Sequence, residues 1–219
     1  MTVQTTAGVL FQTAEESRYT WDDNFPGYYA DVQLFQGSDV YTGKIHINRD
    51  LNVEVTGVAD QQIEEGIYIQ LQETIIRCKR YNFQQFHSQH EFSLEPTDDI
   101  GAVTVIVKGE SIDSQYKIRD QKICQERRVM GRIALLIDTC DYFDTGAGYI
   151  ANRYNVMFCN SKTNEVTSVL KFTDTYQKFG DYYIMTKQVV EEYENGISDA
   201  SLPDTHSITE FKYSNIKLL

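Results

Sequence analysis

The chain has 219 residues, 41% of them hydrophobic, and its 20 basic and 32 acidic residues give a formal net charge of −12. A chain of this length can bury a sizeable core as one large domain without a disulfide framework. The acidic balance repels polyanions at long range, so nucleic acid and anionic membranes are disfavoured as partners of the chain as a whole.

Cysteine spacing and the N-terminal segment narrow the class further. The four cysteines lie far apart without CxxC spacing, which argues against a zinc ribbon and a thioredoxin-type redox pair. The first 19 residues contain neither a basic region nor a long apolar core, and no later run reaches the length of a transmembrane helix. We therefore expect a cytoplasmic protein without a transmembrane segment.

The first predicted element is a helix over residues 5–19. Ala7, Leu10, Phe11 and Ala14 recur at i, i+3, i+4 and i+7, and a threonine at position 5 or 6 can serve as the N-cap.

A three-stranded meander follows between residues 28 and 58. Apolar residues alternate with polar ones along 28–34, 41–47 and 51–55, and short turns separate the three runs. One face of this meander should be buried by Val32, Leu34, Ile45, Ile47, Val53 and Val55.

The second predicted helix spans residues 61–80. Ile63, Ile67, Leu71 and Ile75 step by four, which predicts one apolar face packed on the sheet.

The segment HSQHE brings two histidines and a carboxylate close together in sequence. On a helix, His87 and His90 would share a face and could hold a metal with Glu91. The alternative, which we favour, is a solvated loop before a strand that starts at His90 and separates the two rings. We accordingly predict no metal site.

Strands are expected again from residue 102 onward. AVTVIVK at 102–108 alternates, and 115–126 reads as a hairpin with its turn at 119–121. Asp138, Asp141 and Asp144 could suggest calcium, but the spacing does not fit an EF-hand, so we interpret this segment as a polar turn.

Long alternating strands make up the last third of the chain. Runs at 150–158, 166–177 and 182–193 precede a terminal strand in which Phe211 and Tyr213 lie on one face and Ile216 and Leu218 on the other. This change of parity predicts a bulge near residues 214–215.

These elements predict a mainly β (α+β) fold with about ten or eleven strands. Strand twist accumulates along an antiparallel meander, which favours one curved sheet or half-barrel with two covering helices. No repeat or proline-rich linker divides the chain, so residues 1–219 should form a single domain.

The order of motifs resembles the DUF3386 family of uncharacterised proteins, best known from cyanobacteria. The resemblance rests on WDDNFPGYYADV at 21–32, RRVMGR at 127–132, and the segments KFTDTYQKFGDYYIMTKQVV and ITEFKYSNIKLL. More distantly, the pattern is similar to the lipoprotein-carrier fold of the LolA and LppX type. This second resemblance implies a curved sheet that wraps helices around an apolar cavity, and the family motif implies no catalytic residues.

Motifs for catalysis and cofactor binding are not evident in the sequence. There is no GxSxG, SxxK, P-loop or GxGxxG pattern, and aspartates on either side of Cys140 disfavour a reactive thiolate. The GxW start typical of lipocalins is also missing, which makes a calycin-type hydrolase or lyase the least favoured hypothesis. We expect binding rather than catalysis, with no catalytic residue and no cofactor.

Aromatic residues remain as the candidates for function, with 15 Tyr and 11 Phe. They either line a cavity that holds an apolar or amphipathic small molecule such as a lipid, or fill the core of a protein-interaction or assembly factor. The predicted pocket-lining residues are Val103, Val105, Val107, Tyr154, Val156, Phe158, Leu170, Phe172 and Tyr176.

Overall fold

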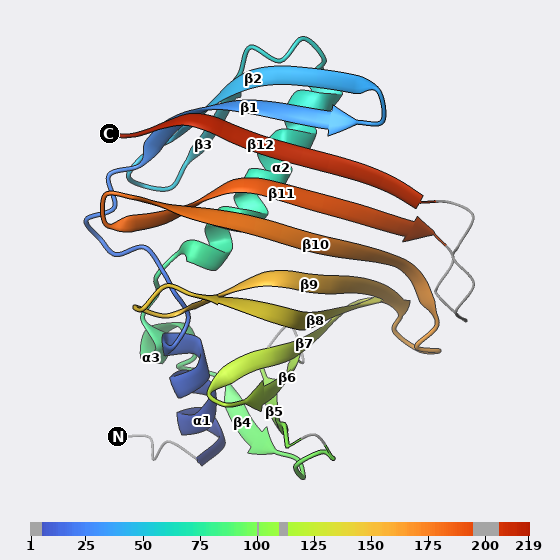
Figure 1. The fold of residues 1–219 in the computed structure, drawn as a ribbon. Coiled ribbons are helices and arrows are strands. Elements are labelled where there is room, and N and C mark those ends of the chain that lie inside the picture. Colours follow the sequence, from blue (N-terminus) through green and yellow to red (C-terminus); the bar gives the residue numbers. More distant parts are fainter. Residues whose placement is uncertain (1–5, 100, 110–113, 195–205) are drawn as a thin grey trace. The chain divides into compact units, whose positions relative to one another are not determined.

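The computed structural model describes residues 6–99, 101–109, 114–194 and 206–219 (Figure 1). Twelve strands in these ranges form one antiparallel sheet in the order β3-β2-β1-β12-β11-β10-β9-β8-β7-β6-β5-β4. The predicted fold class, mainly β with one antiparallel sheet and covering helices, is confirmed.

Most strands are joined to their sheet neighbours by short turns, and β12 pairs with β1 near the start of the chain. The strands are β1 (Tyr28–Gln36), β2 (Asp39–Ile47), β3 (Val53–Thr56), β4 (Glu91–Leu94), β5 (Val103–Lys108), β6 (Ser114–Arg119), β7 (Lys122–Met130), β8 (Ile133–Asp144), β9 (Tyr149–Asn160), β10 (Val166–Phe179), β11 (Tyr182–Glu194) and β12 (His206–Leu218).

The helices within the described ranges are α1 (Thr6–Glu16), α2 (Gln61–Cys78) and the single-turn α3 (Phe83–Phe86). Asp60 caps α2, because its side chain accepts hydrogen bonds from the backbone N–H groups of Gln62 and Ile63. None of these helices combines the length and the hydropathy of a membrane-crossing segment.

The chain divides into two compact units, which are treated separately below. The first unit comprises residues 1–19, 81–172 and 192–206, and the second comprises 20–80, 173–191 and 207–219. The expectation of a single domain stays a prediction.

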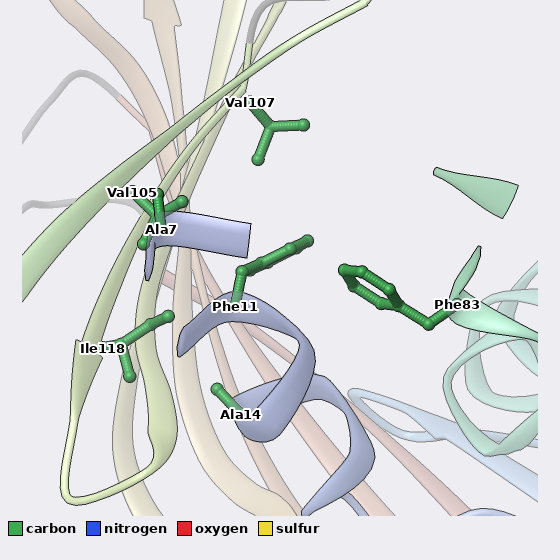
Figure 2. Close-up of a cluster of buried hydrophobic side chains, with 7 residues drawn as sticks. All are labelled: Ala7, Phe11, Ala14, Phe83, Val105, Val107 and Ile118. Atoms are coloured by element: carbon green, nitrogen blue, oxygen red, sulfur yellow. The ribbon is translucent and has the colours of Figure 1, made fainter. Parts of the chain in front are cut away.

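In the first unit, α1 packs on strands β5 and β6 through an aromatic side chain. Phe11, which is 1% exposed, belongs to a buried cluster with Ala7, Ala14, Phe83, Val105, Val107 and Ile118. Figure 2 shows Phe83 facing Phe11 from the segment after α2. The predicted apolar face of the first helix is therefore confirmed.

In the second unit, α2 buries one of its sides. The three strands of the β1–β2–β3 meander all bury the same face of the sheet. Ile67, Leu71 and Ile75 are almost completely buried, as the spacing of four predicts. Val32, Leu34, Ile45, Ile47 and Val53 are also buried, and Val55 is half-buried. The predicted meander and its inward face are confirmed.

The predicted bulge in the terminal strand is also present. Tyr29 pairs with Lys217 and Asp31 with Ser214, so two residues of β12 oppose one residue of β1. Asn215 takes a positive φ of 51° at this point, which an asparagine tolerates better than most residues.

The interpretation of Asp138, Asp141 and Asp144 as a polar turn is wrong. All three belong to β8, a twelve-residue strand that pairs with β7 and β9. Register shifts around Asp141 interrupt the alternation along this strand, which removes the period-two signal from its sequence. The turn lies instead at residues 145–148, between β8 and β9.

Candidate functional site

The predicted pocket residues of β5 lie beneath α1. Val105 and Val107 belong to the cluster around Phe11, whereas Val103 is half-buried and lies outside that cluster. In this part of the predicted pocket, the Phe11 side chain fills the space that a ligand would occupy.

The predicted pocket residues of β9 and β10 include one stacked aromatic pair. Tyr154 stacks on Phe172 with ring centroids 4.8 Å apart and an interplanar angle of 7°. Val156 is buried, and Phe158 and Leu170 are half-buried. The structure thus joins Val105 with Val107 and Tyr154 with Phe172, while one pocket lined by all nine residues stays a prediction.

The second unit contains a chain of polar side chains, two buried and one half-buried, that the sequence analysis missed. Gln188 of β11 is 1% exposed and Asp174 of β10 is 5% exposed. The Gln188 amide donates a hydrogen bond to Asp174 Oδ1 at 2.8 Å. From α2, the Gln70 amide donates to Gln188 Oε1 at 2.6 Å. We call Asp174, Gln188 and Gln70 the polar array.

Two tyrosine side chains, one on β12 and one on β10, interact with Asp174 of the polar array. The Tyr213 hydroxyl of β12 is buried and makes no hydrogen bond with the described residues. Burial raises the pKa of Tyr213, and the negative charge of Asp174 raises it further. From β10, the Tyr176 hydroxyl donates to Asp174 Oδ2 at 3.5 Å, at the limit of a hydrogen bond. The array thus offers a carboxylate and an amide inside an otherwise apolar face.

A sequence signal for this array existed in the parity of β10. Asp174 falls on the same side of the strand as Phe172 and Tyr176, both of which were predicted to face inward. A carboxylate on an inward-facing position is costly unless it is hydrogen-bonded, so such a position marks a special environment.

A cleft of about 270 Å³ opens elsewhere in the second unit, where the segment after α2 meets the loops at 20–27 and 48–52. Its walls are predominantly charged, and beneath them Trp21 stacks on Phe25 with ring centroids 4.1 Å apart. The cleft is lined by Trp21, Asp22, Asp23, Phe25, Arg49, Asp50, Leu51, Lys79 and Arg80. Three cations balance three carboxylates there, so the cleft has no net preference for an anion or a cation.

The histidine pair is arranged differently from the prediction. The two Nδ1 atoms of His87 and His90 lie 3.1 Å apart, so the expectation that a strand start separates the rings is wrong. The rings meet because α3 ends at Phe86 and β4 begins only at Glu91, which leaves a tight connection between them. In the part of the chain that the structure describes, no three His, Cys, Asp or Glu side chains group as a metal site requires.

Sequence comparison assigns the chain to a family. The model of DUF3386, a protein family of unknown function, matches residues 2–219. The chain therefore belongs to the DUF3386 family. No curated protein matches it significantly.

Comparison of folds finds distant solved structures. A DUF1329 family protein from Desulfovibrio piger is 10% identical, with 97% of this chain and 92% of that chain covered and a TM-score of 0.29. The MucA/MucB complex of Pseudomonas aeruginosa gives 9% identity, 95% and 93% coverage and a TM-score of 0.28. A second structure of MucB, in complex with MucA(peri), gives 9% identity, 98% and 94% coverage and a TM-score of 0.26. At these TM-scores the likenesses carry no argument about function.

Proposed function

We propose that the protein is a non-enzymatic binding scaffold that holds an apolar or amphipathic small molecule against the helix-covered sheet face of the second unit. The observation that carries this proposal is the polar array. Asp174 and Gln188 are buried, and α2, which buries Ile67, Leu71 and Ile75, contacts Gln188 through Gln70. A mostly apolar surface with a few fixed polar groups is typical of small-molecule sites.

The energetic argument distinguishes a binding role from a structural one. Buried amide and carboxylate groups lose hydration, and their internal hydrogen bonds at best offset that loss. An apolar residue of similar shape at one position leaves hydrogen-bond partners unsatisfied and destabilises the fold to some extent whatever the role of the array. If the array serves a ligand, its replacement reduces binding more than it reduces stability.

Gln70 provides the route by which a ligand could enter. Its amide is the α2 group that contacts Gln188, so a ligand with a polar group can take over this hydrogen bond when α2 moves outward. The apolar part of the ligand then replaces the side chains of α2 on the sheet. At about 25 cal/mol per Å² of buried apolar surface, micromolar affinity remains after ordering costs are subtracted.

The test is displacement of a polarity-sensitive fluorescent dye from the purified full chain and from Gln188→Leu. We expect saturable dye binding by the wild type and at least about tenfold weaker binding by the variant, with a thermal midpoint that stays within a few degrees. Gln177→Leu, at an exposed position of β10, is the matched control and should bind like the wild type. A wild type that is folded and binds no dye would contradict the proposal.

A protein-interaction or assembly factor is the second candidate function. The outward side of α2 favours it, because Tyr68, Ile69 and Ile76 are 42%, 54% and 63% exposed. Scattered apolar side chains on a surface are ordinary, but three on one helix can form part of a contact. If the dye does not bind, Ile69→Ser with Ile76→Ser should remove a partner that the wild type retains in affinity purification.

We also propose a cytoplasmic location. All four cysteines are free thiols, including exposed Cys140, which suits a reducing compartment. Subcellular fractionation of the native host tests this, and recovery with secreted or periplasmic proteins would contradict it.

A further inference from the structure

The hairpin between β7 and β8 ends in two exposed apolar side chains. Met130 and Ile133 pair directly across a two-residue turn, and each is 50% exposed. Gly131 opens the turn with a positive φ of 64°, which a tight hairpin needs and glycine adopts without strain. Because opposed residues of antiparallel strands point to the same side, Met130 and Ile133 project together.

Basic residues lie at this turn and in the loop beside it. Arg132 lies in the turn and Lys162 lies in the neighbouring loop between β9 and β10, whereas Arg127, three residues before Met130, points to the opposite face of β7. This loop is held at the turn, because the Ser161 hydroxyl donates to the Gly131 carbonyl at 3.0 Å and the Ser161 N–H donates to the Arg132 carbonyl at 3.0 Å.

Nearby carboxylates neutralise part of this charge but not all of it. Glu126 pairs with Arg128, and Glu165 is the acidic residue of the β9–β10 loop. Arg127 donates to the side-chain oxygen of Asn164 at 3.3 Å, which is a neutral partner. Arg132 and Lys162 against one remaining carboxylate, Glu165, leave a local positive charge in a chain whose net charge is −12.

We infer that this tip, made of Met130, Arg132, Ile133 and Lys162, docks the protein on an anionic lipid surface. Apolar side chains flanked by Arg and Lys match a bilayer interface, where aliphatic groups enter the acyl boundary and cations meet anionic head groups. The positive charge of the tip is therefore the reason for proposing an anionic lipid surface as its partner.

The pairing of the strands favours a lipid surface over an acidic peptide. A peptide needs a groove or an unpaired sheet edge, but β7 pairs with β6 and β8, and β8 pairs with β7 and β9. Residues 127–133 also contain no aromatic side chain on which a nucleic acid base could stack.

The acidity of the whole chain sets the conditions for this docking. Salt screens charges over about 8 Å at physiological ionic strength, so distant carboxylates act weakly on a contact made by the tip. At low salt their repulsion extends further and opposes approach. Binding should therefore require contact by the tip itself and weaken when concentrated salt screens the tip as well.

The experiment is co-sedimentation of the full chain with vesicles of phosphatidylcholine alone or with about one third phosphatidylserine, at about 0.15 M salt. We expect binding to the anionic vesicles only. Removing one cation by Arg132→Gln should weaken binding about fivefold, and Met130→Ser with Ile133→Ser should weaken it at least about tenfold.

Matched controls separate the tip from the rest of the surface. Val40→Ser changes an exposed apolar residue beside the β1–β2 turn, and Lys178→Gln removes an exposed cation of β10. Both should bind like the wild type, and thermal unfolding should show that all variants are folded.

Three results would overturn the inference. They are equal binding to neutral and anionic vesicles, vesicle binding that survives both tip variants, and no binding to anionic vesicles by a folded wild type. In the last case, binding of polyglutamate through the tip would assign the tip to an acidic protein partner.

Discussion

At the scale of single residues, His87 shows how packing can hold an ionisable group neutral. Its ring packs among Phe11, Phe83 and Phe92, and its Nε2 atom is buried without a hydrogen bond to the described residues. Burial lowers the pKa of His87 to about 4, the nearby His90 contributes, and Glu15 on α1 acts in the opposite direction.

The lowered pKa predicts that acid destabilises the protein through His87. The unfolded chain takes up a proton near pH 6.5, whereas the folded state takes it up near pH 4, so the unfolded state binds more protons between these values. The free energy of unfolding should therefore fall as pH drops from 6.5 to 4 and be unaffected by this group above 6.5. Because the ring is half-buried, we expect a loss of about 1 to 3 kcal/mol.

Comparison of the wild type with His87→Phe isolates this contribution from that of the carboxylates. Denaturant unfolding at pH 7 and pH 4.5 should show a smaller loss for the variant than for the wild type. Equal losses in the wild type and His87→Phe would contradict the assignment.

The histidine pair also marks where residue-scale sequence analysis failed. Phe92 and Leu94 correctly indicated a strand, and β4 does begin at Glu91. The single turn of α3 cannot be predicted from four residues, because so short a helix has no measurable periodicity. Because α3 was not predicted, the close approach of His90 to His87 could not be predicted either.

At the scale of elements, hydrophobic periodicity correctly predicted which side of a helix or strand is buried. α2 and β10 each bury one side, and their apolar positions repeat every four and every two residues. β8 was missed because its first half is almost continuously apolar and its second half carries the register shifts around Asp141. A strand without steady alternation gives no signal of its type.

The long helix gives the clearest test at this scale. Leu71 is 1% exposed and packs among the buried side chains of the second unit, so Leu71→Ala should reduce the free energy of unfolding by about 2 to 5 kcal/mol. Ile69→Ala, on the exposed side of the same helix, should stay within about 0.5 kcal/mol. Chemical unfolding of both variants measures the difference. An unchanged midpoint for Leu71→Ala would instead show that α2 detaches before the sheet unfolds.

At the scale of the whole molecule, the sequence predicted the class of the fold but not the order of its strands. Alternation shows which side of a strand is buried, but it carries no information about the neighbour with which the strand pairs. The pairing of β12 with β1 joins the last strand to the first strand and could be anticipated only as a need of the last strand for some partner. The polar array escaped prediction for the same reason, because it joins β10, β11 and α2 across more than 100 residues.

The shared sheet predicts that the two compact units unfold together. Residues 166–172 of β10 belong to the first unit and 173–179 to the second, so one continuous strand takes part in both. Because unfolding one unit would end the strand pairing of β10 halfway along its length, we expect one cooperative thermal transition, as for a single domain. The fluorescence of Trp21, which stacks on Phe25, reports on the second unit, and hydrogen exchange of β6 and β7 reports on the first. Coincident transitions would support the prediction of one domain over residues 1–219. Two midpoints separated by more than about 5 °C would instead mean that each unit has its own stability, since a shift of this size corresponds to about 1 to 2 kcal/mol for domains of this length.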